Sequence, residues 1–286
     1  MREIGNPEIG QIDSAKVKLR VSRGVTLLYF PALEETRLVT HAMSTRLGGV
    51  SANEFSTMNF AIDRGDDPAN VRENYRRVTA AIGCREDQLV LSQQTHTTNL
   101  RIVTEADAGK GVIRPRDYHD IDGLLTNVPG LILVGSFADC VPLYFLDPVH
   151  RAVALSHSGW RGTVGRIGAK TVERMHEEYG TEPEDLIAVI GPSICRSCYE
   201  VSEEVAEAFR GIFPEEEWPE IMDDKGNGKY QLDLWECCRR TLIGAGMLPE
   251  RVTVAGLCTC CHPNLLFSHR ATKGKRGNLG AFLGLQ

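Results

Sequence analysis

Three side chains in this sequence can hold a metal ion or act as nucleophiles, and each ends a strand-like run. Cys140 follows the apolar run 131–137, His157 ends the run 152–156, and His96 stands at the end of an earlier run. Reactive side chains concentrate where a rigid sheet gives way to loops. Two imidazoles and a thiolate suit tetrahedral zinc, and three protein ligands leave a fourth position open, as in catalytic zinc sites.

The long spacing of these residues matches no short zinc motif, so other interpretations stay open. Spacing alone favours a buried Cys140 with two polar histidines. A Cys140 thiolate beside an imidazole could instead attack a carbonyl carbon. The sequence does not distinguish ligand from nucleophile, although the two accompanying histidines favour the ligand. Asp139 precedes Cys140, and its carboxylate either orients one of the histidines or caps a turn.

A second group of possible metal ligands lies in the C-terminal half of the chain. Cys195 and Cys198 form a C-x-x-C pair, and residues 258–262 read Cys-Thr-Cys-Cys-His. The two cysteine pairs of a zinc ribbon are usually about 15–20 residues apart, whereas these are about 60 residues apart. The sequence therefore disfavours a structural zinc here without excluding it, and the role of the 258–262 cluster stays open.

The composition is that of a soluble globular protein. Hydrophobic residues make up 42% of the 286 residues and charged residues 24%. The net charge of −6, from 38 acidic and 32 basic residues, argues against general nucleic-acid binding. The N-terminus has no apolar signal-peptide core, and no apolar run is long enough for a membrane span. We therefore expect a cytoplasmic protein with reduced thiols and with no membrane or nucleic-acid partner.

Helical and strand-like patterns are mixed without a regular alternation. Apolar periodicity and capping residues predict helices over residues 67–82, 163–179, 202–213 and 232–245, and strand-like runs include 25–30, 89–96, 185–190 and 252–257. There is neither a Gly-rich dinucleotide fingerprint nor a P-loop. No linker divides the chain, so we predict a single α+β catalytic domain over residues 24–286. The polar segment 1–23 is expected to be partly disordered.

Six sequence blocks occur together in an order that resembles one known family. They are Ser44–Ser51, Gln94–His96, Ala138–Pro142, His157–Gly162, Gly191–Ile194 with Cys198–Val201, and Phe267–Arg270. From about residue 25 to the end, the chain resembles the YfiH-like family, whose members are called polyphenol oxidases, laccase-domain proteins or purine nucleoside phosphorylases. The resemblance implies a YfiH/CNF-like fold, in which helices sandwich mixed β-sheets in a single domain.

The resemblance also implies a metal centre and a substrate site. The pocket metal, zinc or else copper, would be held by His96, Cys140 and His157. By the same resemblance, Arg46 would contact substrate or phosphate. The implied activity is phosphorolysis of adenosine, inosine and methylthioadenosine, with adenosine deamination as a side reaction, in a monomer or small homo-oligomer.

Further site residues are proposed from their chemistry and position. Arg161 and Arg270 are candidates to bind phosphate with Arg46, because a planar guanidinium matches phosphate oxygens. Cys140, Arg46 and Asp139 form the expected catalytic set. The sequence does not indicate which nucleoside is preferred.

Three departures from the family pattern and three alternative functions complete the expectations. The chain has Gln94–Thr97 where Gln-Val-His-Gly is common, Phe267–Arg270 where Phe-Ser-Tyr-Arg is usual, and a serine in His157–Arg161 where His-Ala-Gly-Trp-Arg has alanine. The change at Phe267–Arg270 leaves substrate preference open. A copper-dependent, laccase-like polyphenol oxidase is one alternative, although the several His-x-His pairs of multicopper sites are missing. A metal-free cysteine hydrolase using Cys140 is another, and a non-catalytic binding protein is a third.

Overall fold

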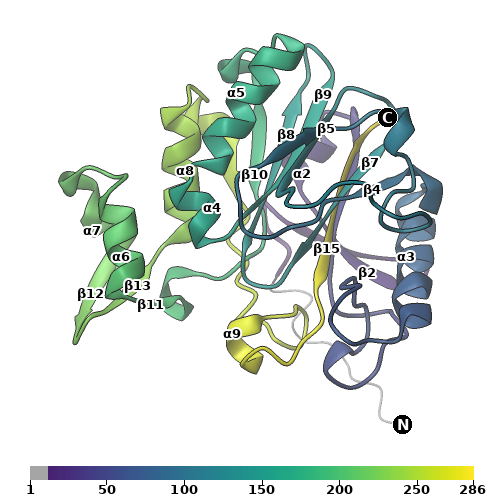
Figure 1. Ribbon diagram of the computed structural model, residues 1–286, viewed down its shortest axis with the longest axis horizontal. Helices are drawn as coiled ribbons and strands as arrows, with labels where there is room; N and C mark the ends of the chain where they lie inside the picture. Colours follow the sequence, from purple (N-terminus) through teal and green to yellow (C-terminus); the bar gives the residue numbers. More distant parts are fainter. Residues whose placement is uncertain (1–11) are drawn as a thin grey trace.

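Two six-stranded sheets pack against each other at the centre of the protein (Figure 1). The computed structural model describes residues 12–286. The first sheet has the order β1 (Lys18–Ser22), β2 (Val25–Tyr29), β3 (Val39–Ser44), β15 (Leu279–Leu285), β7 (Ile132–Phe137) and β4 (Leu89–Leu91). The second has the order β14 (Val252–Val254), β10 (Ile187–Ile190), β8 (Val141–Asp147), β9 (Ala152–Ser158), β6 (Gly123–Thr126) and β5 (Leu100–Ile102).

Both sheets are mixed, and their central strands are covered on both faces. The pairs β4–β7, β5–β6 and β10–β14 are parallel, and the other pairs are antiparallel. All seven residues of β8, β9 and β15 are buried. A strand buried on both faces reads as a continuous apolar run rather than an alternating one, which is why these strands stand out in the sequence.

Helices cover the two outer faces and complete a four-layer arrangement (Figure 1). Helix α3 (Pro68–Ile82) packs on the first sheet through the stripe that includes Val71, Tyr75 and Val78. Helices α5 (Ile167–Tyr179) and α8 (Leu234–Gly244) pack on the second sheet. The predicted α+β domain, with mixed sheets sandwiched by helices, is confirmed.

Shorter elements connect these layers. The short helices are α2 (Pro31–Glu34), α4 (Trp160–Val164), α6 (Glu203–Arg210), α7 (Trp218–Ile221) and α9 (His269–Thr272). The 3-10 turns are η1 (Asn53–Phe55), η2 (Glu86–Gln88), η3 (Glu105–Asp107), η4 (Pro183–Asp185), η5 (Arg196–Cys198), η6 (Glu215–Glu217) and η7 (Pro249–Arg251). A small third sheet has the order β11 (Glu200–Ser202), β13 (Lys229–Leu232) and β12 (Met222–Gly226).

Several boundaries differ from the sequence prediction, including these three. The strand expected over 89–96 ends at Leu91. The helix expected over 163–179 is divided into α4 and α5, because Arg166 adopts a left-handed conformation with φ of 58°. Part of the polar N-terminal segment is ordered: residues 18–22 form β1, which pairs antiparallel with β2. The domain therefore begins before residue 24, and residues 1–11 lie outside the described part of the chain.

The chain crosses from the first sheet to the second at two neighbouring places. The connection from β4 to β5 carries His96, and the connection from β7 to β8 carries Cys140. Because β4 and β7 are adjacent and parallel, both crossings leave the first sheet at the same edge. Strand β9 pairs with β8 and places His157 opposite Pro142. The topology thus brings three distant residues to one point. Over residues 12–286, no helix is long and apolar enough to cross a membrane.

Candidate metal centre and active site

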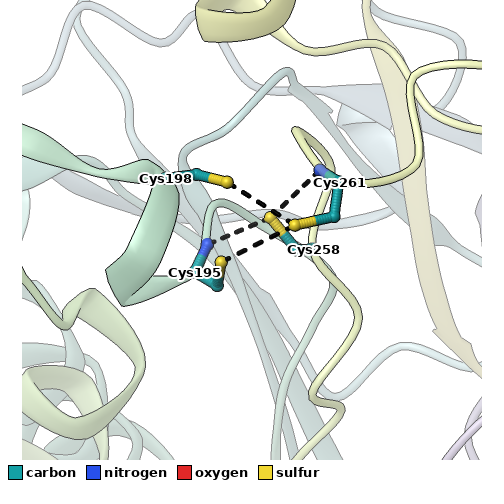
Figure 2. Close-up of side chains that lie close together, drawn as sticks. All are labelled: Cys195, Cys198, Cys258 and Cys261. Atoms are coloured by element: carbon teal, nitrogen blue, oxygen red, sulfur yellow. Dashed lines mark hydrogen bonds between the residues drawn. The ribbon is translucent and has the colours of Figure 1, made fainter.

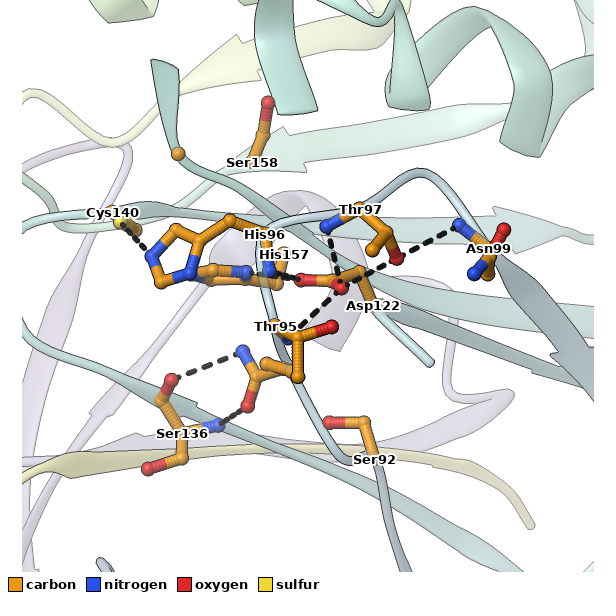
Figure 3. Close-up of polar contacts among 12 residues, drawn as sticks. Ser92, Thr95, His96, Thr97, Asn99, Asp122, Ser136, Cys140, His157 and Ser158 are labelled. Atoms are coloured by element: carbon orange, nitrogen blue, oxygen red, sulfur yellow. Dashed lines mark hydrogen bonds and ion pairs between the residues drawn. The ribbon is translucent and has the colours of Figure 1, made fainter. Parts of the chain in front are cut away.

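The three predicted metal ligands meet between the two sheets (Figure 3). The ligand atoms of His96, Cys140 and His157 all lie within 4.8 Å of one another. His96 Nε2 is 3.9 Å from Cys140 Sγ, and the two imidazole rings are 4.9 Å apart in an edge-to-face arrangement. His157 is buried, Cys140 is half-buried and His96 is exposed. The cluster is therefore closed on one side and accessible on the other.

Asp122, the residue before β6, orients this cluster. Its Oδ1 lies 2.8 Å from His157 Nδ1, and because a carboxylate only accepts hydrogen bonds, Nδ1 is the donor. The backbone N–H groups of residues 95–97 and the Thr97 hydroxyl also donate to this carboxylate. The free Nε2 of His157 is consequently the nitrogen available to a metal, an arrangement typical of metal-binding histidines.

The charges around the cluster favour a thiolate. Burial alone would raise the pKa of Cys140, but the charge of His157 and hydrogen bonds from both imidazoles outweigh burial and lower it. Burial likewise opposes the protonated form of His157, but the Cys140 thiolate and Asp122 raise its pKa. Burial would also raise the pKa of Asp122, yet the His157 contact and the backbone donors lower it to about 2. A metal cation that replaces the proton on His157 Nε2 would therefore meet Cys140 already in its thiolate form.

Asp139 does not orient either histidine, so that alternative is wrong. Its Oδ1 accepts a hydrogen bond from the Thr259 hydroxyl at 2.6 Å, and its Oδ2 accepts one from the Arg270 backbone N–H at 2.6 Å. Its backbone carbonyl accepts from the N–H of Ile194. Asp139 instead ties the loop before Cys140 to two segments of the C-terminal half.

Two residues of the site adopt the left-handed backbone conformation, which is unfavourable for residues other than glycine. His96 has φ of 67° and Asp139 has φ of 90°, conformations that surrounding contacts must hold in place. Gly159 allows the ligands to approach each other. A Cβ atom at this position would lie 2.9 Å from Cys140 Sγ and 3.0 Å from His96 Cδ2. Only glycine fits there without moving a ligand.

A pocket of about 330 Å³ opens beside the cluster, a volume within the range of small-molecule sites. His96, Cys140 and His157 form part of its wall. Phe60, Leu91 and Val134 are among its apolar residues, and Gln93 and Asn278 are among its polar ones. Asn278 Oδ1 is buried and has no hydrogen-bond partner within the described residues. The pocket therefore combines apolar and polar walls with the candidate metal centre.

The three arginines predicted to bind phosphate do not line this pocket. Arg46 donates to the carbonyls of Ser56 and Pro263 and lies over the ring of Phe267. The Arg270 guanidinium donates to the backbone carbonyls of residues 198 and 200. Arg161 is exposed and stacks on Trp160. Their side chains hold loops together or cover an aromatic ring, and their predicted contacts with phosphate stay a prediction.

Three other arginines line the pocket, and no motif distinguished them in the sequence. They are Arg64, Arg116 and Arg276. Arg116 is held by the Ser92 carbonyl and lies 3.9 Å from the carboxylate of Asp63. Burial and the nearby charge of Arg64 lower the pKa of Arg276 to about 10, and its Nε is buried with no hydrogen-bond partner in the described structure. Arg276 ends a short basic stretch of the sequence, Lys273–Arg276, and that stretch is a sequence signal for this group.

Comparison with known proteins agrees with this geometry. Residues 40–286 match the family described as multi-copper polyphenol oxidoreductase laccase. The chain belongs to this laccase-domain family. A protein named purine nucleoside phosphorylase YlmD from Bacillus subtilis (strain 168) is 37% identical over 261 residues, covering 88% of this chain and 91% of its own.

Two further similar proteins extend the comparison. A protein named adenosine deaminase RL5, from an unknown prokaryotic organism, is 32% identical over 232 residues and is covered over 87% of its length, with 80% of this chain aligned. The crystal structure of Bacillus licheniformis hypothetical protein YfiH superposes with a TM-score of 0.88 at 33% identity. That match covers 94% of this chain and 99% of the other. The predicted resemblance to the YfiH-like family is confirmed.

Proposed function

We propose that this protein is a zinc-dependent purine nucleoside phosphorylase that acts on adenosine, inosine and methylthioadenosine and also deaminates adenosine. The observation that carries the proposal is an open three-ligand cluster in the wall of a pocket that also presents guanidinium groups. The names of the YlmD and RL5 relatives support the two reactions. We also propose a cytoplasmic location, where reducing conditions preserve the Cys140 thiolate.

The donor set fits a zinc ion. His157 Nδ1 is committed to Asp122, so Nε2 is free, and the charges of the cluster favour the thiolate form of Cys140. A zinc ion held by His96, Cys140 and His157 would act as a Lewis acid and lower the pKa of a water molecule in its fourth position to about 7. The two histidines and one cysteine match the ligand types of catalytic zinc sites.

The chain's own residues account for substrate binding. Phe60, Leu91 and Val134 offer apolar surface to a purine base. Arg276, supported by Arg64, is our choice for phosphate in place of Arg46, Arg161 and Arg270. Its guanidinium lines the pocket and is partly desolvated, and hydrogen bonds from such a cation to an anion are strong.

The deciding experiment is incubation of the zinc-loaded protein with adenosine, with and without phosphate. We expect adenine and ribose 1-phosphate only when phosphate is present, and inosine in both conditions. Chromatography separates adenine, inosine and hypoxanthine. Absence of both adenine and inosine would overturn the proposal. Oxidation of phenols by the copper-loaded protein would support a polyphenol oxidase instead, and turnover by metal-free protein that thiol alkylation blocks would support a cysteine hydrolase.

Replacing Arg276 with alanine should raise the KM for phosphate about tenfold or more, since a charge-assisted contact contributes about 1.5–3 kcal/mol. Zinc content should not change. Arg276→Lys should recover part of the loss, because lysine keeps the charge without the planar fork. Arg161→Ala is the matched control, because Arg161 lies outside the pocket and stacks on Trp160. A raised phosphate KM in the Arg161 variant with no change in the Arg276 variant would contradict this assignment.

Replacing Gly159 with alanine should weaken zinc binding about tenfold or more, because the new Cβ must displace Cys140 Sγ or the His96 ring. Competition with a chromophoric chelator measures the affinity. Gly244→Ala is the control, since a Cβ there meets nothing within 4 Å and alanine favours a helix. Equal zinc affinity in the Gly159 variant and the wild type would show that zinc binding does not require a glycine beside Cys140 and His96.

A further inference from the structure

A second cluster of metal-binding side chains lies outside the pocket and plays no part in the proposed reaction. Four cysteines, Cys195, Cys198, Cys258 and Cys261, have their sulfur atoms within 4.8 Å of one another (Figure 2). Cys261 Sγ is 3.5 Å from Cys198 Sγ and 4.0 Å from Cys195 Sγ. Cys258 is buried and Cys261 is exposed, so the cluster is accessible at the surface.

The sheet topology explains why residues about 60 positions apart in the sequence meet here. Strands β10 and β14 are parallel neighbours, so the segments that follow them leave the sheet at the same edge. The two segments remain paired beyond the strands: Ser193 forms a bridge with Cys258, the Ser193 N–H donates to Leu257 and the Thr259 N–H donates to Ser193. Each segment then contributes one C-x-x-C pair. The usual spacing of a zinc ribbon does not apply, because the sheet aligns the pairs.

The sulfur geometry fits one metal ion better than disulfides. Four sulfur atoms around a tetrahedral zinc at about 2.3 Å are about 3.8 Å from one another, close to the 3.5 and 4.0 Å observed. A disulfide needs sulfur atoms about 2.05 Å apart, and all four cysteines are free. The backbone N–H groups of Cys195 and Cys261 point at Cys258 Sγ, at 3.3 and 3.4 Å. Such donors stabilise the negative charge of a thiolate.

We propose that Cys195, Cys198, Cys258 and Cys261 hold a second, structural zinc ion as four thiolates, separate from the His96–Cys140–His157 centre. Four sulfur ligands in a tetrahedral arrangement are typical of zinc or of iron–sulfur chemistry, and a closed four-cysteine set marks a structural zinc. The four ligands leave no position for a substrate. The ion joins the loop after β10 to the loop after β14.

The location of this site gives it a positioning role for the pocket. Thr259 lies between two of the ligands, and its hydroxyl donates to Asp139, the residue before Cys140. Ile194, next to Cys195, donates its N–H to the Asp139 carbonyl. Both loops that the zinc joins therefore hold the left-handed Asp139 backbone. Loss of the structural ion should loosen the Cys140 loop even though the ion touches no substrate.

Metal counting on the full-length protein tests the proposal. Purified wild-type protein from zinc-supplemented cells should contain two zinc ions per chain by mass spectrometry. The double variant Cys198→Ser with Cys261→Ser should lose one ion, and the double variant His96→Ala with His157→Ala should lose the other and keep the four-cysteine ion. Cys84→Ser removes a cysteine on a remote element and should keep both. These outcomes separate the structural site from the proposed enzymatic function, because failure of phosphorolysis leaves the counts unchanged.

Thiol protection in the wild-type protein tests the site without a variant that could fail to fold. The four cysteines should resist alkylation together and become reactive together after a chelator removes the ion, as peptide mapping would show. Free alkylation before chelation, a mass that reveals disulfides between these cysteines, iron in place of zinc, or a single zinc that disappears in the histidine double variant would each overturn the proposal.

Discussion

Replacing Cys140 with alanine is expected to abolish phosphate-dependent release of adenine from adenosine and to remove one zinc ion per chain. Cys140 supplies the one anionic ligand of the three-ligand cluster, and two neutral imidazoles alone bind zinc weakly. Metal-assisted catalysis stabilises the transition state by several kcal/mol, and about 4 kcal/mol corresponds to about 10³-fold in rate. The rate of adenine release and the zinc content of the purified variant check the expectation. Retention of both zinc and activity would contradict it.

A second substitution at the same position separates a ligand from a nucleophile. Cys140→Asp keeps an anionic zinc ligand but removes the thiol. If Cys140 serves as a ligand, this variant should hold zinc and keep part of the activity. If Cys140 attacks the substrate, the variant should hold zinc and be inactive. Cys84→Ala is the matched cysteine control, because Cys84 lies at the end of α3 and outside the pocket.

The fully buried strands could be predicted from the sequence because burial on both faces leaves a continuous apolar run. β8, β9 and β15 are buried along their whole length and read as apolar runs. Helix α3 carries its own boundaries, with Asp67 as the N-cap and a left-handed Gly83 at the end. The candidate ligands were chosen because they follow or end such runs: His96, Cys140 and His157. The family resemblance favoured a metal site over the simpler alternative, a buried Cys140 with two polar histidines.

The contacts that cross the two sheets could not be predicted, because they depend on register. Asp122 orients His157 since β6 pairs with β9 in a register that places Gly123 opposite Ser156. Asp139 is next to Cys140 in sequence, yet its side chain turns to Thr259 and Arg270. Spacing rules failed for the four cysteines because two parallel strands align their loops regardless of chain length. Adjacency in sequence was a poor guide to adjacency at the site.

The arginines are a second case in which the sequence could not predict the contacts of a side chain. Arg46 lies in the first of the six blocks that resemble the family, yet its guanidinium joins two loops through the Ser56 and Pro263 carbonyls. Arg276 has no motif and lines the pocket. A residue in a family motif can serve either the fold or the reaction, and the motif alone does not distinguish these roles. Which guanidinium groups line the pocket is known only from the structure.

Replacing Asp122 with asparagine should weaken zinc binding about 10–100-fold, the range typical for the partner of a metal-binding histidine. The carboxylate accepts from His157 Nδ1, from three backbone N–H groups and from the Thr97 hydroxyl. An asparagine has one acceptor oxygen and one donor NH₂ group. If its oxygen faces His157, its NH₂ meets two backbone N–H groups. If its NH₂ faces His157, the histidine must accept at Nδ1 and carry its proton on Nε2, where the metal should bind.

The same substitution should change the response of the metal-free protein to acid. The folded-state pKa of Asp122, about 2, is below its ordinary value of 3.8. The stability that this carboxylate contributes is therefore complete above about pH 4 and is lost as the pH falls towards 2. Linkage gives about 2 kcal/mol for such a shift. Urea unfolding between pH 2 and 6 should show this loss in the wild type and lack it in Asp122→Asn.

Asp120→Asn is the control that makes the Asp122 result specific. Asp120 belongs to the same loop and accepts from Thr95 and His119, but its side chain is about half exposed and does not contact His157. We expect this variant to bind zinc as tightly as the wild type. Because both substitutions remove one negative charge near the site, a long-range electrostatic effect would weaken both variants alike. Weakening confined to Asp122→Asn requires the hydrogen bond to His157, and the reverse result would assign the orienting role elsewhere.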